Sequence, residues 1–211
     1  MTIKDITKQV TAAYDKIANE YQNAYAETDE FDLKYVELFS QLFQGKRVVD
    51  LGCGIGTNAA YLTRKGFDVI GIDNSRKMLD VAKDLYPQNT FMQMNILDLP
   101  SSLGKFDGVI LSYVVNHFNK EMLNKLKTVV DNLLFDDGVV YIAAHLGNEE
   151  RIVSDPLDAN IQLYYNFLSA STLNKLFQNY DRMFIETRTS FGEEEFLCDK
   201  VFIAYRKKAV L

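Results

Sequence analysis

The chain has 211 residues, of which 47% are hydrophobic and 25% are charged, with a formal net charge of −6 and a pI of about 5.0. This balance is that of an ordinary globular protein, and a chain of this length buries roughly 70% of its unfolded surface. The acidic charge argues against a nucleic-acid partner, which requires a basic face. Because no apolar run reaches about 18 residues, we also expect no membrane-spanning helix.

The cysteines and the N-terminus favour a cytoplasmic protein. There are only two cysteines, Cys53 and Cys198, and they lie far apart in the sequence. Reduced thiols are therefore expected rather than a disulfide, and no cysteine and histidine cluster has metal-ligand spacing. The first eight residues lack the apolar segment of a signal peptide. We predict a cytoplasmic chain with no metal site and no membrane association.

The first part of the chain reads as two helices. Over residues 3–26, apolar residues recur at spacings of three and four, which predicts an amphipathic helix rich in tyrosine. Two interpretations of this stripe remain open, simple packing and a lid of residues 1–30 across a ligand site. Residues 27–32 are polar and acidic and suggest a linker. A second helix follows over residues 31–43 and is expected to end at Gly45.

The centre of the sequence is the glycine-rich stretch over residues 47–57, Arg-Val-Val-Asp-Leu-Gly-Cys-Gly-Ile-Gly-Thr. Val48 and Val49 predict the end of a buried parallel strand, and a helix is expected from residue 58, capped by Thr57 or Asn58. The glycines between them permit positive φ and close approach of a ligand to the backbone. A strand, a glycine turn and a helix N-terminus form a cradle for a small, partly charged ligand.

Three interpretations of this turn compete. The dinucleotide fingerprint needs a third glycine where Thr57 stands, so it does not match. The pattern acid-x-Gly-x-Gly-x-Gly matches Asp50 to Gly56 at every fixed position. A plain tight turn between a strand and a helix is the third.

Downstream, strands alternate with helices. Strands are predicted over residues 67–73, 90–94, 106–112 and 139–144, and helices over 57–65, 76–85 (capped by Ser75) and 120–134, with a loop over 113–118. This alternation predicts βαβ units and a parallel sheet, in which ligands bind at the carboxyl ends of the strands. Those ends fall at residues 50–56, Asp73, Asn95, Ser112 and His145.

The last third departs from this rhythm. Residues 147–169 form an insert with three aromatic residues, Tyr164, Tyr165 and Phe167, which we expect to be a helical partial cap. A helix over 171–180 precedes two alternating strands, 183–191 and 200–206, joined by an acidic loop at 192–195, so these strands form an antiparallel hairpin. The predicted fold is one α/β domain over residues 1–211. It has a doubly wound, seven-stranded, mostly parallel Rossmann-like sheet that ends in the hairpin, with N-terminal helices and the insert as a cap.

With these elements in place, the chain resembles a class I S-adenosylmethionine-dependent methyltransferase of the small-molecule type over residues 10–206. The resemblance rests on residues 48–56, on residues 14–21 (Tyr-Asp-Lys-Ile-Ala-Asn-Glu-Tyr), on Asp73 and on the terminal hairpin. It implies an S-adenosylmethionine site formed by Tyr14, Tyr21, Asp50, Gly52, Cys53, Gly54, Asp73, Asn74, Met78, Asn95, Ile96 and Ser112. Asp73 would accept from the ribose hydroxyls, and Asn95 stands where the family places an acid beside the adenine. Asp50 would steady the loop, and the two tyrosines would close over the methionine end.

The resemblance implies methyl transfer by in-line displacement, giving S-adenosylhomocysteine. The protein then mainly aligns the donor with the acceptor and excludes water, and a base is needed only if the acceptor loses a proton. His117 and His145 are the only histidines, and both fall at the functional edge of the sheet. Each is a candidate base or a hydrogen-bonded structural group. Asn116 is a candidate substrate contact, and the aromatic residues of the insert are candidates for an acceptor wall.

Other functions stay open. A nucleotide-dependent enzyme of the NAD type has a similar sheet, and a non-catalytic protein can retain an S-adenosylmethionine site. The acceptor is expected to be a small molecule, and oxygen, nitrogen and carbon acceptors are all compatible with the sequence. Both a monomer and a homodimer are compatible with it too.

Overall fold

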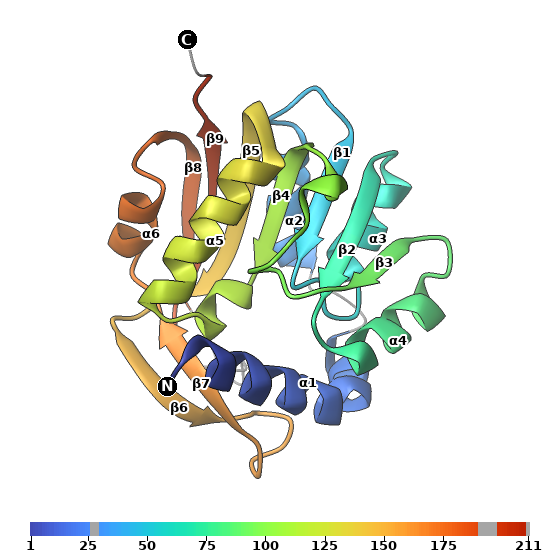
Figure 1. Cartoon of the computed structure of the whole chain (residues 1–211), viewed down its shortest axis with the longest axis vertical. Helices are drawn as coiled ribbons and strands as arrows, with labels where there is room; N and C mark the ends of the chain where they lie inside the picture. Colours follow the sequence, from blue (N-terminus) through green and yellow to red (C-terminus); the bar gives the residue numbers. More distant parts are fainter. Residues whose placement is uncertain (26–29, 190–197, 210–211) are drawn as a thin grey trace.

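The computed structural model describes residues 1–25, 30–189 and 198–209. Its centre is a seven-stranded sheet with the order β3-β2-β1-β4-β5-β9-β8 (Figure 1). β1 (Arg47–Leu51), β2 (Asp68–Asp73), β3 (Thr90–Gln93), β4 (Phe106–Ser112) and β5 (Leu134–His145) run parallel, and β9 (Lys200–Lys207) is antiparallel to β5 and to β8 (Tyr180–Arg188). The predicted seven-stranded, mostly parallel sheet with a terminal hairpin is confirmed.

The strand order fixes where a ligand can bind. β1 lies between β2 and β4, so the chain winds outward in one direction from β1 and in the other from β4. The crevice at such a reversal lies outside the carboxyl ends of the strands and is the usual ligand site of open α/β sheets.

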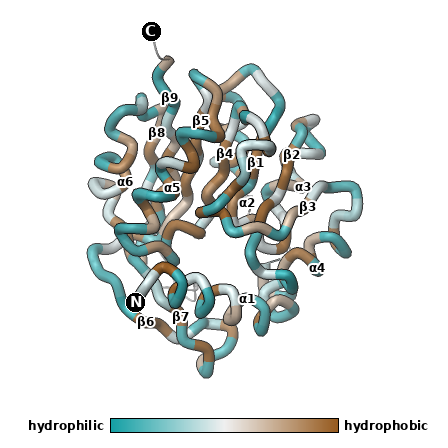
Figure 2. Tube along the Cα trace, in the orientation of Figure 1, coloured by the Kyte–Doolittle hydropathy of each residue, from teal (hydrophilic) through white to brown (hydrophobic). Residues whose placement is uncertain are grey.

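Both faces of the sheet are covered, because neighbouring residues of one strand point to opposite faces. Val49 packs in the core that contains α5 (Lys120–Leu133), whereas Val48 packs with Phe39 of α2 (Glu30–Ser40) in the core on the other face. α3 (Thr57–Arg64) and α4 (Arg76–Leu85) join the second core, and α6 (Ala170–Leu176) joins the first. Figure 2 shows the resulting concentration of hydrophobic residues in the central strands. Parallel strands buried on both faces read as continuous apolar runs.

α1 (Ile3–Tyr25) lies across the carboxyl edge of the sheet, between α4 and the strand β7 (Figure 1). The helix predicted over residues 3–26 is thus confirmed within one residue. Thr2 and Asp5 start it with a reciprocal cap, in which the Asp5 amide donates to Thr2 Oγ1 and the Thr2 amide donates to Asp5 Oδ2. Ile6, Ala13, Ile17 and Ala18 form its buried stripe.

The prediction of a helical insert after β5 is wrong. The insert is a separate two-stranded antiparallel sheet made of β6 (Glu149–Ser154) and β7 (Gln162–Phe167). Its aromatic and β-branched residues favour paired strands, and Asp155 organises the turn by accepting from the amides of Leu157 and Asp158. Leu163, Tyr165 and Phe167 pack against Ala13 and Ile17, so β7 supports α1.

Smaller differences concern element ends. The N-cap of α3 is Gly56, with φ 82° and no side-chain cap, so neither Thr57 nor Asn58 caps that helix as predicted. β5 starts at Leu134, earlier than the predicted strand 139–144; Asp137 within it has φ 64°, and the pairing with β4 shifts register. The predicted loop 113–118 contains a short 3-10 helix, η2 (Val114–His117), and another, η1 (Ser101–Leu103), precedes β4.

Two predicted segments fall partly or wholly beyond the described ranges. α2 begins at residue 30, so the end of the predicted linker 27–32 is helical, and residues 26–29 lie outside the described structure. The acidic loop at 192–195 also lies outside it. Within the described ranges, every helix is too short or too polar to cross a bilayer.

Candidate active site

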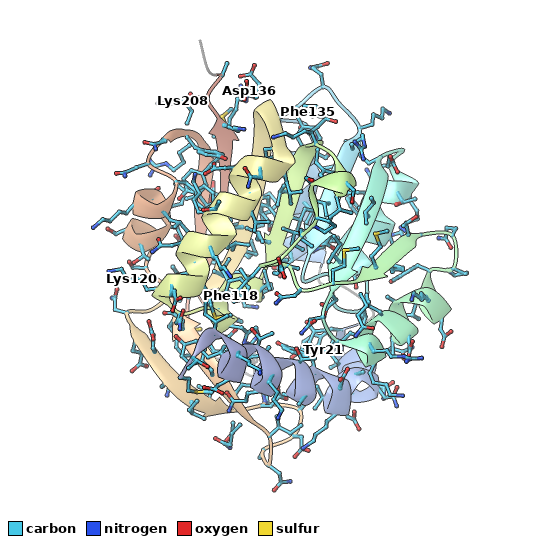
Figure 3. All side chains as sticks on the ribbon, in the orientation of Figure 1. Tyr21, Phe118, Lys120, Phe135, Asp136 and Lys208 are labelled. Atoms are coloured by element: carbon cyan, nitrogen blue, oxygen red, sulfur yellow. The ribbon has the colours of Figure 1, made fainter. Side chains whose placement is uncertain are left out.

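A cavity lies between α1 and the carboxyl ends of β1, β2 and β4. Its volume is about 120 Å³, and it opens to solvent at its mouth. α1 closes one side of it, and Figure 3 labels two lining residues, Tyr21 on α1 and Phe118 beside the start of α5. The lining residues are Ile6, Thr7, Val10, Thr11, Tyr14, Tyr21, Gly52, Gly54, Asp73, Asn74, Ser75, Met78, Asn95, Ile96, Leu97, Ser112, Tyr113, Val114, His117, Phe118 and Met122.

The glycine turn forms the floor beside β1. Gly52, Gly54 and Gly56 all have positive φ, at 74°, 53° and 82°. The Gly52 and Cys53 amides both donate to the Ile72 carbonyl, which fastens the turn to β2. A Cβ on Gly54 would meet no atom within 4 Å, because this position faces open space in the cavity. Gly54 is therefore where a ligand can lie against the backbone.

Asp73 joins the turn to the next helix. Its Oδ2 accepts from the Gly54 amide at 2.9 Å, and its Oδ1 accepts from the Ser75 amide at 2.8 Å. Burial raises the pKa of this carboxyl, and the amides of Ser75, Gly54 and Asn74 act against that rise. Each oxygen keeps a second lone pair, so the carboxylate remains able to accept from two hydroxyls of a ligand.

The start of α4 is bonded to α1. Ser75 caps α4 by accepting from the Met78 amide, as predicted, and its hydroxyl donates to Asp15 Oδ1 at 2.6 Å. Asp15 Oδ1 also accepts from the Lys77 amide, and Asn74 Nδ2 donates to Thr11 Oγ1 at 2.6 Å. These three bonds hold the middle of α1 over the end of β2.

Asn95 and Ile96 follow β3 and line the cavity. Asn95 Oδ1 accepts from the Leu97 amide at 3.0 Å, which turns the chain into the cavity wall. The side chain of Asn95 is exposed, whereas Ile96 is buried. The Asn95 oxygen keeps a second lone pair, with which it can accept from a ligand.

Asp50 and Cys53 do not line the cavity, although both were predicted cofactor residues. Asp50 is 1% exposed and neither of its oxygens has a hydrogen-bond partner, while the nearby Ala59 amide slightly favours the charged form. Burial and the charge of Asp73 raise the Asp50 pKa to about 7. Burial likewise raises the pKa of the Cys53 thiol well above its ordinary value, so this thiol is not a reactive one.

Tyr113 carries backbone strain at the end of β4. It has φ 58° and ψ −4°, a left-handed conformation that is costly for a residue with a Cβ. Its amide donates to the Ala143 carbonyl, and its hydroxyl donates to Asp32 at 2.7 Å. These bonds hold the strained turn, which sends η2 along the cavity wall. Strain of this kind is concentrated at functional sites.

His117 and Tyr14 meet in the cavity wall. The Tyr14 hydroxyl lies 2.8 Å from His117 Nε2, and His117 Nδ1 lies 3.2 Å from the Tyr164 carbonyl. A carbonyl only accepts, so Nδ1 carries the proton and Nε2 accepts from Tyr14. Burial lowers the His117 pKa to about 4, so this imidazole is neutral near pH 7.

His145 is not among the lining residues. It is 2% exposed, and its Nδ1 lies 2.6 Å from the Tyr165 hydroxyl. Burial, and then the positive charge of Lys200, lower its pKa to about 3. Its backbone amide donates to Asn116 Oδ1, and Asn116 Nδ2 donates to the His145 and Asn166 carbonyls. Asn116 therefore ties η2 to β5 and β7 rather than facing the cavity.

The structure brings together most of the predicted site. Every predicted cofactor residue except Asp50 and Cys53 lines the cavity, and of the two candidate bases only His117 does. Among Tyr164, Tyr165 and Phe167, none lines it. Sequence reasoning missed Ile6, Thr7, Val10, Thr11, Ser75, Leu97, Val114, Phe118 and Met122 as lining residues. The stripe containing Ile6 and Val10 was visible, but no pattern showed which neighbours of that stripe would face a ligand.

Comparisons with known proteins agree with this arrangement. Residues 48–138 match a family model described as a methyltransferase domain. An uncharacterized methyltransferase of Alkaliphilus oremlandii is 29% identical over 151 residues, covering 65% of this chain and 68% of that protein. The match to an uncharacterized methyltransferase of Synechocystis is 36% identical but covers only 45% of each protein.

Two solved structures share nearly the whole fold. The Burkholderia thailandensis 1,6-didemethyltoxoflavin-N1-methyltransferase, solved with 1,6-didemethyltoxoflavin and S-adenosylhomocysteine, superposes with a TM-score of 0.77 at 15% identity, over 99% of this chain and 92% of that one. The (4+2)-cyclase SpnF superposes with a TM-score of 0.75 at 14% identity, over 97% of each chain.

The strand order, the glycine turn with its acid and the matched segment agree with one another. Residues 48–138 match a methyltransferase domain, and the fold is that of the class I S-adenosylmethionine-dependent methyltransferases.

Proposed function

We propose that the protein transfers the methyl group of S-adenosylmethionine to a small-molecule acceptor by in-line displacement, releasing S-adenosylhomocysteine. The observation that carries this proposal is the joint placement of Gly52, Gly54 and Asp73 around one cavity, with Asp73 bonded to the Gly54 amide. The methyltransferase-domain match over residues 48–138 and the S-adenosylhomocysteine bound in the Burkholderia thailandensis structure support the same cofactor.

The residues present fit this cofactor. Asp73 offers two acceptor oxygens for a ribose diol, and Gly54 leaves the backbone open for the methionine part. Asp50 is a buried carboxyl group without a hydrogen-bond partner just behind the turn, and a cationic ligand group at the turn would favour its charged form. Tyr14 and Tyr21 of α1 would cover the methionine end as a lid.

Most of the catalysis would come from alignment. The sulfonium is an activated methyl donor, and its leaving group is a neutral thioether. A cavity closed on one side by α1 would hold donor and acceptor in line and exclude water, which supplies most of what such a displacement needs.

Calorimetric titration tests the cofactor. We expect S-adenosylmethionine and S-adenosylhomocysteine to bind at one site, NAD not to bind, and Asp73→Ala to lose at least 10-fold in affinity. Asp84→Ala is the matched control, because Asp84 is an exposed carboxylate on α4. Binding of NAD alone, or unchanged affinity in Asp73→Ala, would contradict the proposed site.

A second candidate function is a reaction other than methyl transfer, and testing it requires a measurement of product formation. SpnF has this fold and is a cyclase, so binding alone does not establish methyl transfer. Formation of S-adenosylhomocysteine in the presence of a metabolite extract separates the two: a protein that binds the cofactor without consuming it would be a binding protein or an enzyme of another class.

A further inference from the structure

The half of the cavity around the Tyr14–His117 pair is apolar. Val114 is three residues before His117 and Phe118 follows it, and Ile6 and Val10 lie on the same face of α1 as Tyr14. Ile6, Phe118 and Met122 belong to one hydrophobic cluster, against which Val10 and Val114 pack. The pair is therefore set in a hydrophobic wall, opposite the polar end formed by Asp73 and Asn74.

The charges in the cavity limit what the acceptor can be. Among the lining residues that the structure describes, Asp73 is the only one with a formal charge near pH 7. Its two oxygens are already bonded to the Gly54 and Ser75 amides at the cofactor end. A carboxylate or phosphate near the reacting atom would have no lysine or arginine in this wall, and an ammonium group would have no second carboxylate. Burying an unpaired charge is costly, so the geometry favours a neutral acceptor.

The hydrogen bonds of the pair define a route for one proton. Nδ1 of His117 donates to the Tyr164 carbonyl, so Nε2 of His117 is the accepting atom. Nε2 accepts a hydrogen bond from the Tyr14 hydroxyl at 2.8 Å. A ligand hydroxyl that donates to Tyr14 Oη would thus reach the imidazole through the phenol. His117 is 5% exposed, so a ligand meets the phenol before it meets the ring.

Resting on the methyl transfer proposed above, we propose that the acceptor is a neutral molecule with an apolar body, methylated on a hydroxyl oxygen, and that Tyr14 relays its proton to His117. The oxygen forms a bond to the methyl carbon, and the sulfonium C–S bond breaks with its electron pair passing to sulfur. The hydroxyl proton moves to Tyr14 Oη while the Tyr14 proton moves to His117 Nε2. The products are the methyl ether, S-adenosylhomocysteine and an imidazolium that later releases its proton to water.

Because His117 is a weak base, it can take the proton of a hydroxyl oxygen that is being methylated, but not that of a methylated aliphatic amine. Burial lowers the His117 pKa to about 4. A hydroxyl oxygen that is accepting a methyl group becomes a strong acid, so even a weak base takes its proton. A methylated aliphatic amine is a weak acid and would not give up its proton to such an imidazole.

Thr7 adds a second polar contact on the same side. Its Oγ1 is buried without a hydrogen-bond partner, and Thr7 lines the cavity on the helix that carries Tyr14. An acceptor with one further polar atom would satisfy this hydroxyl.

Isotope transfer tests the acceptor class. A metabolite extract is separated by ion exchange into neutral, anionic and cationic fractions, and each is incubated with the protein and S-adenosylmethionine carrying a ¹³C methyl group. We expect label in the neutral fraction, and NMR of the product to show the methyl on oxygen. Label in a charged fraction, or on nitrogen or carbon, would overturn this inference while leaving methyl transfer intact. No label in any fraction would overturn both.

Variants test the relay on the labelled acceptor. Tyr14→Phe and His117→Gln are expected to lower kcat about 10²-fold while the KM for S-adenosylmethionine changes less than about threefold. The matched control is Tyr25→Phe, which removes a hydroxyl from the same helix away from the cavity lining and should leave kcat unchanged. Equal loss in all three variants would mean that α1 is merely disturbed.

The pH profile separates a proton relay from a structural role. Because His117 is neutral throughout, the wild-type kcat should be flat from pH 6 to pH 8. In His117→Gln the acceptor must lose its proton to solvent, so kcat should rise with pH, up to tenfold per unit. A flat profile in the variant would contradict the relay. Nitrogen-15 NMR of the ligand-free protein gives a check that needs no turnover: a proton on Nε2 of His117 instead of Nδ1 would overturn it.

Discussion

At the scale of single residues, two glycines of one turn have separate roles. A Cβ on Gly52 would lie 2.6 Å from Val114 Cγ2, whereas a Cβ on Gly54 would meet open space in the cavity. Both have positive φ, which costs a non-glycine residue roughly 1–2 kcal/mol. Gly52 is thus needed for the packing of the turn against Val114, and Gly54 leaves space for a ligand.

We therefore expect opposite defects from two identical substitutions. Gly52→Ala should lower the free energy of unfolding by about 2–4 kcal/mol, because it adds the overlap with Val114 to the backbone strain. Gly54→Ala should cost only about 1–2 kcal/mol but weaken S-adenosylmethionine binding at least 10-fold. Urea unfolding and calorimetry measure the two quantities. Equal effects on stability and on affinity in both variants would show that the turn behaves as one unit.

The raised pKa of Asp50 makes the free energy of unfolding depend on pH. Its pKa is about 7 in the folded protein, well above its ordinary value of 3.8. Between these values the folded state holds a proton that the unfolded state has lost, so the contribution of Asp50 to stability falls as pH rises. Its slope is up to about 1.4 kcal/mol per pH unit. Asp50→Asn should remove this slope in the ligand-free protein, measured by urea unfolding from pH 4 to pH 8.

The control for that experiment is Asp84→Asn on the exposed face of α4. It should leave the pH dependence of the wild type unchanged. If Asp50→Asn shows the wild-type slope, Asp50 is not the proton-holding group of the folded state.

At the scale of elements, the attachment of α1 determines how the cavity closes. Asp15 accepts from the Ser75 hydroxyl and from the Lys77 amide, and no other carboxylate of α1 bonds to α4 among the contacts that the structure describes. Deleting one such bond to a charged group costs about 1.5–3 kcal/mol. The loss would fall on the docking of α1 rather than on the sheet.

Asp15→Ala should therefore loosen the helix locally. We expect faster amide hydrogen exchange over residues 3–25 and faster release of S-adenosylmethionine, with little change in β1 and β4. Glu20→Ala, an exposed acid on the same helix, is the control. Unchanged exchange in α1 would mean that its apolar stripe alone holds it.

Some of the helices and strands could be predicted from the sequence, and the insert could not. The alternation of apolar runs with glycine and acid predicted the strands around Asp50 and Asp73, because buried parallel strands leave a strong pattern. The insert was misread because Tyr164, Tyr165 and Phe167 are buried on both faces of a short hairpin, and a compact apolar run does not distinguish a strand from a helix.

The candidate site was predictable only in part, for a related reason. Gly54 and Asp73 are constrained by the backbone, so their spacing in the sequence is informative. Thr7, Phe118 and Met122 line the cavity only because α1 and η2 dock where they do. The Tyr14–His117 bond joins residues 103 positions apart, and no local pattern predicts such a pair.

At the scale of the whole molecule, the two histidines determine much of the response to acid. Both pKa values are lowered, to about 4 for His117 and about 3 for His145, from an ordinary value of 6.5. Below pH 6.5 the unfolded chain gains protons that the folded protein excludes, so each histidine's contribution to stability is lost as pH falls. Asp50 acts in the opposite direction over the same range.

His145→Asn should make the protein less sensitive to acid. Asparagine keeps a polar atom near the position of Nδ1, beside the Tyr165 hydroxyl. Between pH 7.5 and pH 5, the stability of the variant relative to wild type should improve by about 2 kcal/mol, as judged by urea unfolding. A constant difference across this range would show that His145 titrates normally in the folded protein.

The place of β9 has a consequence for synthesis of the chain on the ribosome. β9 is the last strand along the described part of the chain, yet it lies between β5 and β8 and pairs with both. Until residues 200–207 emerge, the buried strand β5 has an open apolar edge, and β8 has no partner in the sheet. Nascent chains paused before this point should therefore depend on chaperones, although the strands beside the cavity, β3-β2-β1-β4, are already complete.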